Sequence, residues 1–310
     1  MLVDTTVKTD MDQIEILSVS LLNTHRALVE EMRRIGDELH IGLGWHYLLD
    51  LNWAAHMLQH NPGQHVMDAG AGTGVMQWWL AAQGINVLSV DRSDRANLDL
   101  RFRAWCPLQG LRPGDLQPLP RPGLREFLPP RRPWQWHRWP GNLYHALSIA
   151  MAKEPRPPHH RGTVTICNQD LANIFDIPDA SVDAVVSISA LEHNEPDGLR
   201  CVVKELMRVI KPGGKLVATL GAAKEKDWFH EPSKGWCYTE ATLRDIFDLP
   251  ADCSSNYDQY DELFEMLRDC AELRENLADF YFKSDENGMP WGIWDPKYQS
   301  VGVVKTKRYG

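Results

Sequence analysis

The sequence lacks the features that mark a membrane-spanning, secreted or disulfide-stapled protein. Apolar residues never run uninterrupted for the roughly 18 positions that a bilayer-crossing helix needs. The first residues, MLVDTTVKTDMDQIE, carry acids where a secretory signal has a basic start and an apolar run. The six cysteines are scattered without a CxxC pair, so neither a zinc site nor a disulfide framework is indicated. We therefore expect a cytoplasmic protein that holds no metal and does not bind a membrane.

The chain also lacks the positive charge of a typical nucleic-acid-binding protein. Its net charge is −9, which disfavours bulk binding to DNA or RNA. The charge is uneven, because residues 92–161 contain 12 Arg and one Lys against five acids, a local charge of +8. This basic stretch suits an anionic ligand, so we expect a small-molecule partner and no nucleic acid.

Short apolar runs alternate with amphipathic ones through the middle of the chain. Amphipathic runs typical of helices lie at 74–83 and 199–210, and the second ends in a KPGG turn. Runs typical of strands occupy 65–70, 85–91, 163–170, 181–193 and 215–222. This order predicts an α/β fold with a Rossmann-like, mostly parallel sheet and helices on both faces.

The N-terminal stretch predicts helices rather than strands. Apolar residues between Ile14 and Ile35 recur at helical spacing, and a second helix is predicted over 47–59. Residues 1–64 are therefore expected to form a helical extension ahead of the sheet.

The C-terminal stretch, residues 222–310, departs from the regular alternation. A loop comes first, and helices are predicted over 239–247 and near 260–276. The first of these helices has a good N-cap in Thr239. A last strand is predicted over 299–305. We expect this part to contribute to a substrate pocket.

Residues 92–161 are predicted to be an insertion between the second and third strands, either a plain insertion or a lid. They hold 12 of the 20 prolines, a density that excludes long helices and central strands from most of the segment. Only NLYHALSIAMAK, at 142–153, has a helical pattern. Two readings of RRPWQWHRWP, at 131–140, stay open. Its indoles and cations stack on bases, sugars or rings, or it forms a cap that buries Trp and solvates Arg.

A glycine-rich loop leaves the first strand of the sheet and opens the first helix. Its sequence over 66–74 is VMDAGAGTG, and glycines allow a sharp turn and a close approach of the backbone to a ligand. A dinucleotide-binding loop would read GxGxxG, whereas the spacing here is GxGxG and position 75 is a valine. Asp68 inside this segment would repel a pyrophosphate, but it suits a ligand that carries an ammonium group and a sulfonium.

Two further acids follow the next two predicted strands. Asp91 ends the second strand, 23 residues after Asp68, where a carboxylate can accept hydrogen bonds from both ribose hydroxyls of an adenosine. Asp170 and Leu171 follow the third strand. Because the carboxyl ends of parallel strands share one edge of a sheet, these residues are expected to reach the same crevice and the adenine.

Together these residues resemble the class I S-adenosylmethionine-dependent methyltransferases. The matching pieces occur in the family's order, and they are DAGAGTG, the acids of LSVD and NQDL, SVDAVVSISALEH and LMRVIKPGGKLVATL. The resemblance implies a methyltransferase domain over 65–310 with S-adenosylmethionine as the cofactor. The cofactor residues that it implies are Gly70, Gly72 and Gly74 at the methionine end, Asp91 at the ribose and Asp170 at the adenine. The long insertion departs from the family's usual pattern.

Methyl transfer needs an acceptor aligned with the methyl carbon and sometimes a base that takes a proton. His193, after Glu192 near the end of the fourth predicted strand, is one candidate for this base. The same Leu-Glu-His sequence also occurs in the resembled family as a plain strand-to-helix turn. His230, after the fifth strand, is a second candidate for the base. Alternatively, it is an ordinary residue of a surface loop. The aromatic groups at 44–47 and 227–230 either shape the acceptor pocket or fix the extension to the core.

Motifs that the sequence does not contain narrow the acceptor. No DPPY or NPPY is present, the tetrapeptides with which some family members methylate planar nitrogens, and no His/Asp cluster has metal-binding spacing. We therefore predict a methyltransferase that acts on a small molecule at oxygen or nitrogen. Two alternatives stay open. The chain is an RNA or protein methyltransferase that docks through the basic insertion, or it binds S-adenosylmethionine without catalysis.

Overall fold

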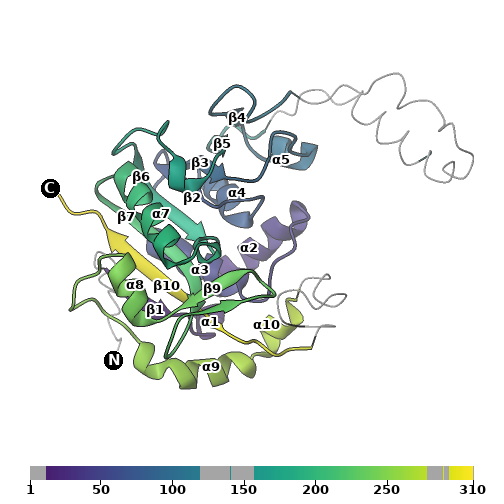
Figure 1. The fold of residues 1–310 in the computed structure, drawn as a ribbon. Coiled ribbons are helices and arrows are strands. Elements are labelled where there is room, and N and C mark those ends of the chain that lie inside the picture. Colours follow the sequence, from purple (N-terminus) through teal and green to yellow (C-terminus); the bar gives the residue numbers. More distant parts are fainter. Residues whose placement is uncertain (1–11, 119–139, 141–156, 278–288, 290–292, 310) are drawn as a thin grey trace, which may run out of the picture.

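The centre of the molecule is a ten-stranded sheet with helices on both faces (Figure 1). The computed structural model describes residues 12–118, 140, 157–277, 289 and 293–309. The strand order is β1-β10-β7-β6-β2-β3-β5-β4, and the β8–β9 hairpin pairs with the end of β7. Pairing is parallel from β7 to β4 and antiparallel at β10 and β1. The structure thus confirms the predicted Rossmann-like α/β fold.

The strands of the parallel part lie where the apolar runs predicted them. They are β2 (His65–Ala69), β3 (Asn86–Asp91), β5 (Val164–Asn168), β6 (Val182–Ile188) and β7 (Ile210–Ala222). The remaining strands are β1 (Gln13–Ile16), β4 (Leu108–Gly110), β8 (Trp228–His230), β9 (Gly235–Tyr238) and β10 (Gln299–Thr306).

Helices pack on both faces of this sheet. The N-terminal half contributes α1 (Leu21–Thr24), α2 (Arg26–Glu38), α3 (Tyr47–Leu58), α4 (Val75–Ala82) and α5 (Leu100–Trp105). The C-terminal half contributes α7 (Pro196–Val209), α8 (Glu240–Ile246), α9 (Tyr260–Arg268) and α10 (Ala271–Glu275). Short 3-10 turns are η3 (Leu171–Asn173), η4 (Leu191–His193) and η5 (Tyr257–Gln259).

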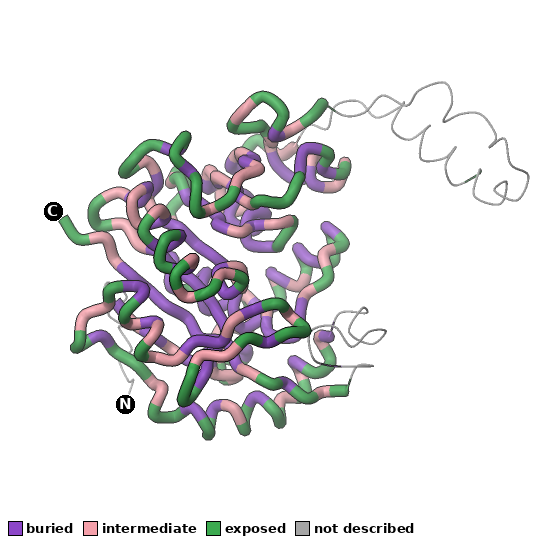
Figure 2. The backbone as a smooth tube through the Cα atoms, viewed as in Figure 1, coloured by how far each residue is buried: buried purple, intermediate pink, exposed green. Residues whose placement is uncertain are grey.

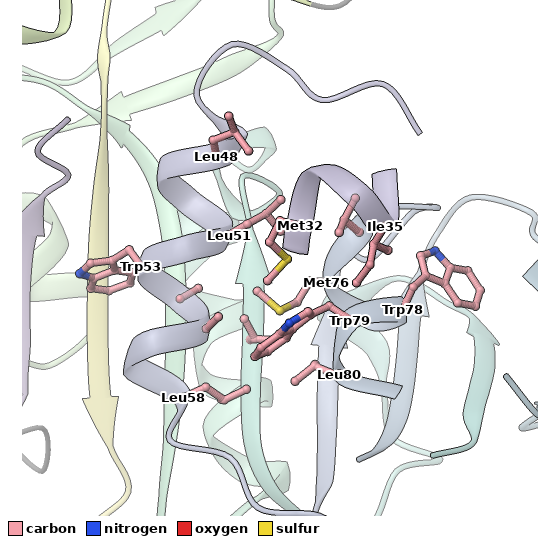
Figure 3. Close-up of a cluster of buried hydrophobic side chains, with 14 of the residues drawn as sticks. Met32, Ile35, Leu48, Leu51, Trp53, Leu58, Met76, Trp78, Trp79 and Leu80 are labelled. Atoms are coloured by element: carbon pink, nitrogen blue, oxygen red, sulfur yellow. The ribbon is translucent and has the colours of Figure 1, made fainter. Parts of the chain in front are cut away.

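Alternate residues of each central strand enter two different hydrophobic cores, because successive strand side chains point to opposite faces. Val66 of β2 belongs to the core that contains α2, α3 and α4, while Met67 belongs to the core that contains α7 and α8. Figure 2 shows the buried residues concentrated along the strands and on the inner sides of the helices. Figure 3 shows how side chains of α2, α3 and α4 interlock in the first core.

The prediction of a helix at Ile14 is wrong, because residues 13–16 form the edge strand β1. Ile14 and Ile16 are buried while Gln13 and Glu15 are half-buried, a period of two rather than 3.6. This strand pairs with β10, nearly 300 residues away in sequence, over Gln13↔Val304 to Ile16↔Val301. Apolar residues that follow in α1 and α2 do have helical spacing, and the prediction extended this pattern backwards to Ile14. Pairing with β10 instead makes this first segment a strand.

The C-terminal part contains more elements than the sequence indicated. The segment predicted as a loop before Thr239 includes the β8–β9 hairpin, and the helix predicted over 260–276 is divided into α9 and α10. The predicted N-cap is present, since the Thr239 side chain accepts a hydrogen bond from the amide of Thr242 at 3.3 Å. The KPGG segment lies within β7, at an irregularity in its pairing with β6.

The described parts of the insertion, 92–118 and 157–161, form α5 and the edge strand β4, which pairs with β5. The run at 131–140 lies outside the described residues apart from Pro140, and the helix predicted over 142–153 lies wholly outside them.

Candidate functional site

A cavity of about 500 Å³ opens at the carboxyl ends of the parallel strands. It lies where the strand order reverses, since the chain runs from β2 to β3 on one side and returns to β6 on the other. The segment between α2 and α3 contributes Ile41 and Leu43, and α3 contributes Tyr47 and Leu51. Every cofactor residue named from the sequence lines this one cavity: Asp68, Gly70, Gly72, Gly74, Asp91, Asp170 and Leu171.

The glycine loop connects β2 to α4 through a backbone conformation that favours glycine. Gly70 has a φ of +75° and Gly72 a φ of +47°. A Cβ atom on Gly70 would lie 2.4 Å from the Cβ of Ala190, so the loop runs directly against the turn that follows β6. The loop therefore presents bare backbone to the cavity, and a ligand can approach it closely.

Asp91 is fixed at the end of β3 by two backbone amides. One carboxylate oxygen accepts the N–H of Gly72 at 2.8 Å, and the other accepts the N–H of Ser93 at 2.7 Å. Burial alone would raise the pKa of Asp91, but the hydrogen bonds from Ser93 and Gly72 and the charge of Arg95 outweigh it and lower the pKa. Asp91 is thus an oriented carboxylate whose remaining lone pairs can accept hydrogen bonds from a ligand.

Asp68 lies at the bottom of the cavity and is only 2% exposed. Burial raises the pKa of Asp68 to about 7, against the lowering effect of Arg95, and the nearby Asp91 raises it further. This carboxyl therefore exchanges its proton near neutral pH, and a cationic ligand would favour its charged form.

Asp170 and Leu171 lie on the β5 side of the cavity. Since β5 pairs with β3, they lie next to the strand that carries Asp91. The carboxylate of Asp170 caps η3 by accepting the N–H of Ala172 at 2.9 Å. Asp170 is exposed, so its carboxylate is available to a ligand at the rim.

A buried glutamine that sequence analysis missed supports the glycine loop from below. The Nε2 atom of Gln77 donates to the carbonyl oxygens of Ala71, Gly72 and Gly74 at 3.2 to 3.3 Å. Its Oε1 atom accepts the hydroxyl of Ser89 at 2.7 Å. A lone glutamine inside the apolar run of α4 was the available signal, because a buried amide needs hydrogen-bond partners.

His193 follows β6 in η4 and lines the same cavity. Its Nδ1 atom lies 2.9 Å from the carbonyl oxygen of Lys234. A carbonyl oxygen can only accept, so we assign the proton of the neutral ring to Nδ1. The Nε2 atom then carries a free lone pair, which is the state that a general base needs.

Glu192, next to His193, is a second residue that the sequence did not single out. It accepts a hydrogen bond from the hydroxyl of Ser189, and its Oε2 atom is buried without a partner among the described residues. Burial raises the pKa of Glu192, while His193 and His46 lower it. Ser189 lines the cavity with a φ of +47°, so Glu192 holds a cavity residue in an unusual backbone conformation.

His230, the other predicted base, is not among the residues that line this cavity. It lies in β8 and is 5% exposed, so it is not the surface-loop residue of the alternative reading. Its Nδ1 atom lies 2.7 Å from the Ser233 hydroxyl, and its ring centre lies 5.1 Å from that of Tyr298. Burial, and then the charge of Lys297, lower the pKa of His230. The structure thus brings only one of the two candidate bases to the cofactor residues.

The predicted aromatic group at 44–47 divides between the cavity and the core. Tyr47 lines the cavity. Trp45 is 1% exposed and packs edge-on against Trp294 and Tyr298, at 5.8 and 5.3 Å between ring centres. Most of this group therefore fixes the N-terminal segment to the C-terminal one.

A family model described as "Methyltransferase domain" matches residues 144–218, which include β5, β6, α7 and part of β7. The matched strands β5 and β6 precede Asp170 and His193 in the cavity described above. This match agrees with the predicted resemblance to the class I S-adenosylmethionine-dependent methyltransferases and with the predicted methyltransferase activity.

Several solved structures are similar to this methyltransferase. The cyclase SpnF is 13% identical with a TM-score of 0.48, over 96% of this chain and 99% of that one. The 1,6-didemethyltoxoflavin-N1-methyltransferase of Burkholderia thailandensis is 14% identical with a TM-score of 0.38, over 93% and 84%. The magnesium protoporphyrin IX methyltransferase of Synechocystis is 17% identical with a TM-score of 0.34, over 71% of both chains. No curated protein matches the chain.

In the part of the chain that the structure describes, no group of three or more His, Cys, Asp or Glu residues is arranged to hold a metal ion. None of the helices in this part has the length and apolarity that crossing a membrane requires.

Proposed function

We propose that this methyltransferase acts on an oxygen or nitrogen atom of a small molecule, with His193 as the general base. The observation that carries the proposal is the position of His193. Its ring lines the same cavity as the cofactor residues, and its Nδ1 atom is engaged by Lys234, which leaves Nε2 free. The unpaired cysteines scattered through the structure support a reducing compartment, and we place the enzyme in the cytoplasm.

The residues of the cavity fit the cofactor in their chemistry. Asp91 would accept the ribose hydroxyls, and Asp170 with Leu171 would contact the adenine. The bare backbone at Gly70, Gly72 and Gly74 would admit the methionine end, whose positive charge suits Asp68. When bound, S-adenosylmethionine supplies a methyl group that is activated by attachment to a sulfonium.

His193 would take the proton that the acceptor loses. The acceptor hydroxyl or amine gives its proton to Nε2, and Nδ1–H continues to donate to the carbonyl of Lys234. Tyr47 and the apolar side chains of Ile41 and Leu43 also line the cavity, where they would help to exclude water once ligands are bound.

The size of the cavity supports a small acceptor. Its volume of about 500 Å³ lies within the range of roughly 300–1,000 Å³ that is usual for small-molecule sites. The alternative of docking to RNA or protein rests on the basic insertion, of which residues 119–139 and 141–156 lie outside the described part. No contact within the described residues favours that alternative.

Calorimetric titration with S-adenosylmethionine and S-adenosylhomocysteine tests the cofactor site. We expect the wild type to bind both ligands and Asp91→Ala to lose at least about tenfold in affinity, because hydrogen bonds to a charged group contribute about 1.5–3 kcal/mol. Asp99→Ala is the matched control, since Asp99 is exposed and only pairs with Arg101 at 3.4 Å. A folded wild type that binds neither ligand would refute the proposal.

A labelled methyl group tests the class of acceptor. The enzyme is incubated with deuteromethyl S-adenosylmethionine and with separated small-molecule and macromolecular fractions of a cell extract. Label in the small-molecule fraction, lost in His193→Ala, supports the proposal. Label only in RNA or protein supports the docking alternative, and cofactor binding without transfer in either fraction supports the non-catalytic one.

A further inference from the structure

Arg95 lies beneath the glycine loop and is only 4% exposed. Its Nη1 atom donates to the carbonyl oxygen of Gly72 at 3.2 Å and to the hydroxyl of Ser89 at 2.5 Å. Its Nη2 atom donates to the carbonyl oxygens of Ser89 and Cys167, both at 2.9 Å, and its Nε atom to Asn168 Oδ1 at 3.3 Å. One guanidinium thus joins the glycine loop to β3 and β5. Only the planar fork of an arginine offers this many donors in fixed directions.

Gly72 is held from both sides by this arrangement. Its N–H donates to Asp91, and its carbonyl oxygen accepts from Arg95 and from Gln77. Its φ of +47° is readily adopted by glycine, whose backbone is otherwise free to move, so these bonds select one conformation of the turn. The turn of the loop that approaches the ligand therefore depends on Asp91 above and on Arg95 below.

Arg95 also supplies positive charge to the acids of the cavity. The ionisable groups that interact with it are Asp91, Asp68, Cys167 and Asp115. The charge of Arg95 acts to lower the pKa of both Asp68 and Asp91. Asp115 is engaged elsewhere, by Arg112 and the amide of Asn168. Arg95 is therefore a buried cation that favours the charged forms of the two cavity carboxyls.

We propose that Arg95 is a positioning residue of the cofactor site, which fixes the turn at Gly72 and favours the charged forms of Asp68 and Asp91. The charged form of Asp68 suits the ammonium group and the sulfonium of S-adenosylmethionine. The inference rests on the proposed function for the identity of this ligand. The support of the loop and the ionisation of Asp68 are properties of the ligand-free protein.

Four variants separate the charge of Arg95 from its hydrogen bonds. Arg95→Lys keeps the charge and loses most of the donors, whereas Arg95→Met loses both. Asp68→Asn removes the carboxyl that responds to the charge. Arg34→Met is the matched control, because Arg34 is an exposed arginine of α2 that pairs with Glu38 at 2.7 Å.

The first measurement is the affinity for S-adenosylmethionine by calorimetry at pH 6, 7 and 8. Since Asp68 has a pKa of about 7, we expect the wild-type affinity to fall about tenfold from pH 8 to pH 6. Arg95→Met should bind at least about tenfold more weakly at pH 7 and recover at higher pH, because Asp68 then ionises only at higher pH. Asp68→Asn should lose the pH dependence, and Arg34→Met should match the wild type.

The second measurement is amide hydrogen exchange of residues 70–74 in the ligand-free protein. We expect faster exchange in both Arg95→Lys and Arg95→Met than in Arg34→Met, because both variants lose the bond to Gly72. If Arg95→Met does not fold, Arg95→Lys still tests the support of the loop, and Asp68→Asn still tests whether Asp68 causes the pH dependence.

Two outcomes would overturn the inference. If the affinity of Arg95→Met for S-adenosylmethionine depends on pH as that of the wild type does, Arg95 does not influence the ionisation of Asp68. If amide exchange at residues 70–74 is unchanged in both Arg95 variants, Arg95 does not support the glycine loop. A wild type that binds no S-adenosylmethionine defeats the proposed function instead, and the exchange measurement still decides whether Arg95 holds the loop.

Discussion

His193 and Asp91 in this site each form hydrogen bonds to the protein backbone and keep a further atom or lone pair available to a ligand. His193 gives Nδ1–H to Lys234 and keeps Nε2 free, and Asp91 accepts two backbone amides while retaining lone pairs. Such engagement fixes the orientation of a group before the ligand arrives, so binding requires less ordering of side chains.

Replacing His193 by Gln is predicted to reduce kcat by about 10²–10⁴-fold, because a glutamine amide cannot take up a proton. The affinity for S-adenosylmethionine should change little, since the cofactor residues lie elsewhere in the cavity. Steady-state kinetics with a labelled acceptor, combined with cofactor titration, measure the two effects. His230→Gln is the comparison, and it should retain kcat. A normal kcat in His193→Gln would show that the acceptor needs no base from this residue.

The sequence indicated Asp68 and Asp91 because a local motif and strand position mark them. It did not indicate Arg95 or Gln77, whose contributions depend on being buried under the loop. Arg95 was counted within the basic segment as a cation that faces an anionic ligand, whereas in the structure it is buried and hydrogen-bonded to Gly72, Ser89 and Cys167. Burial of a polar residue is decided by contacts between distant segments, and the residue type alone favours exposure.

At the scale of elements, the N-terminal helix α3 is joined to the C-terminal strand β10 by a close fit. Figure 3 shows Trp53 extending from α3 over β10. A Cβ atom on Gly302 would lie only 2.3 Å from the Trp53 ring. The indole nitrogen of Trp53 also donates to Glu15 of β1 at 2.8 Å. Three segments from the two ends of the chain therefore meet at Trp53.

Gly302→Ala is predicted to reduce the free energy of unfolding by about 1–3 kcal/mol, because the added methyl overpacks the contact with Trp53. Gly198→Ala is the matched control. Gly198 lies in α7, and the nearest atom to its new Cβ is the Cβ of Asn194 at 3.7 Å, so helix propensity should stabilise the protein by about 0.5–1 kcal/mol. Urea unfolding measures both. Equal stability of the two variants would contradict the close fit.

Long, regular elements were predicted better than short ones. The strands of the parallel sheet and helices α4 and α7 followed from their apolar periods, which are properties of the local sequence. The edge strand β1 and the β8–β9 hairpin were missed, because their runs are only three or four residues long. The partner of β1 also lies at the other end of the chain, in β10.

At the scale of the whole molecule, the raised pKa of Asp68 couples the cofactor site to folding stability. The pKa of Asp68 is about 7 in the folded state, above its ordinary value of 3.8, so the folded protein binds the proton more tightly. This contribution to the free energy of unfolding is present at low pH and is lost as pH rises between these values. At about 1.4 kcal/mol per pH unit, the full difference is about 4 kcal/mol.

Asp68→Asn is therefore predicted to gain stability relative to the wild type as pH rises from 5 to 8, in the absence of ligand. The neutral amide resembles the protonated acid, and it avoids the cost of a buried charge at high pH. Urea unfolding at several pH values measures the difference between the two proteins, so that other titrating groups cancel. A difference that stays constant with pH would show that Asp68 titrates normally in the folded protein.

The sequence by itself determined the α/β fold and the place of the cofactor loop. Glycine spacing, strand-end acids and apolar periodicity act over a few neighbouring residues, so they can be seen in the chain before it folds. Only the tertiary structure decided that His193 lies in the cavity and His230 outside it, and that Arg95 lies beneath the glycine loop. These outcomes depend on which distant segments pack together, since packing alone settles which polar groups lose water and which atoms remain free for a ligand.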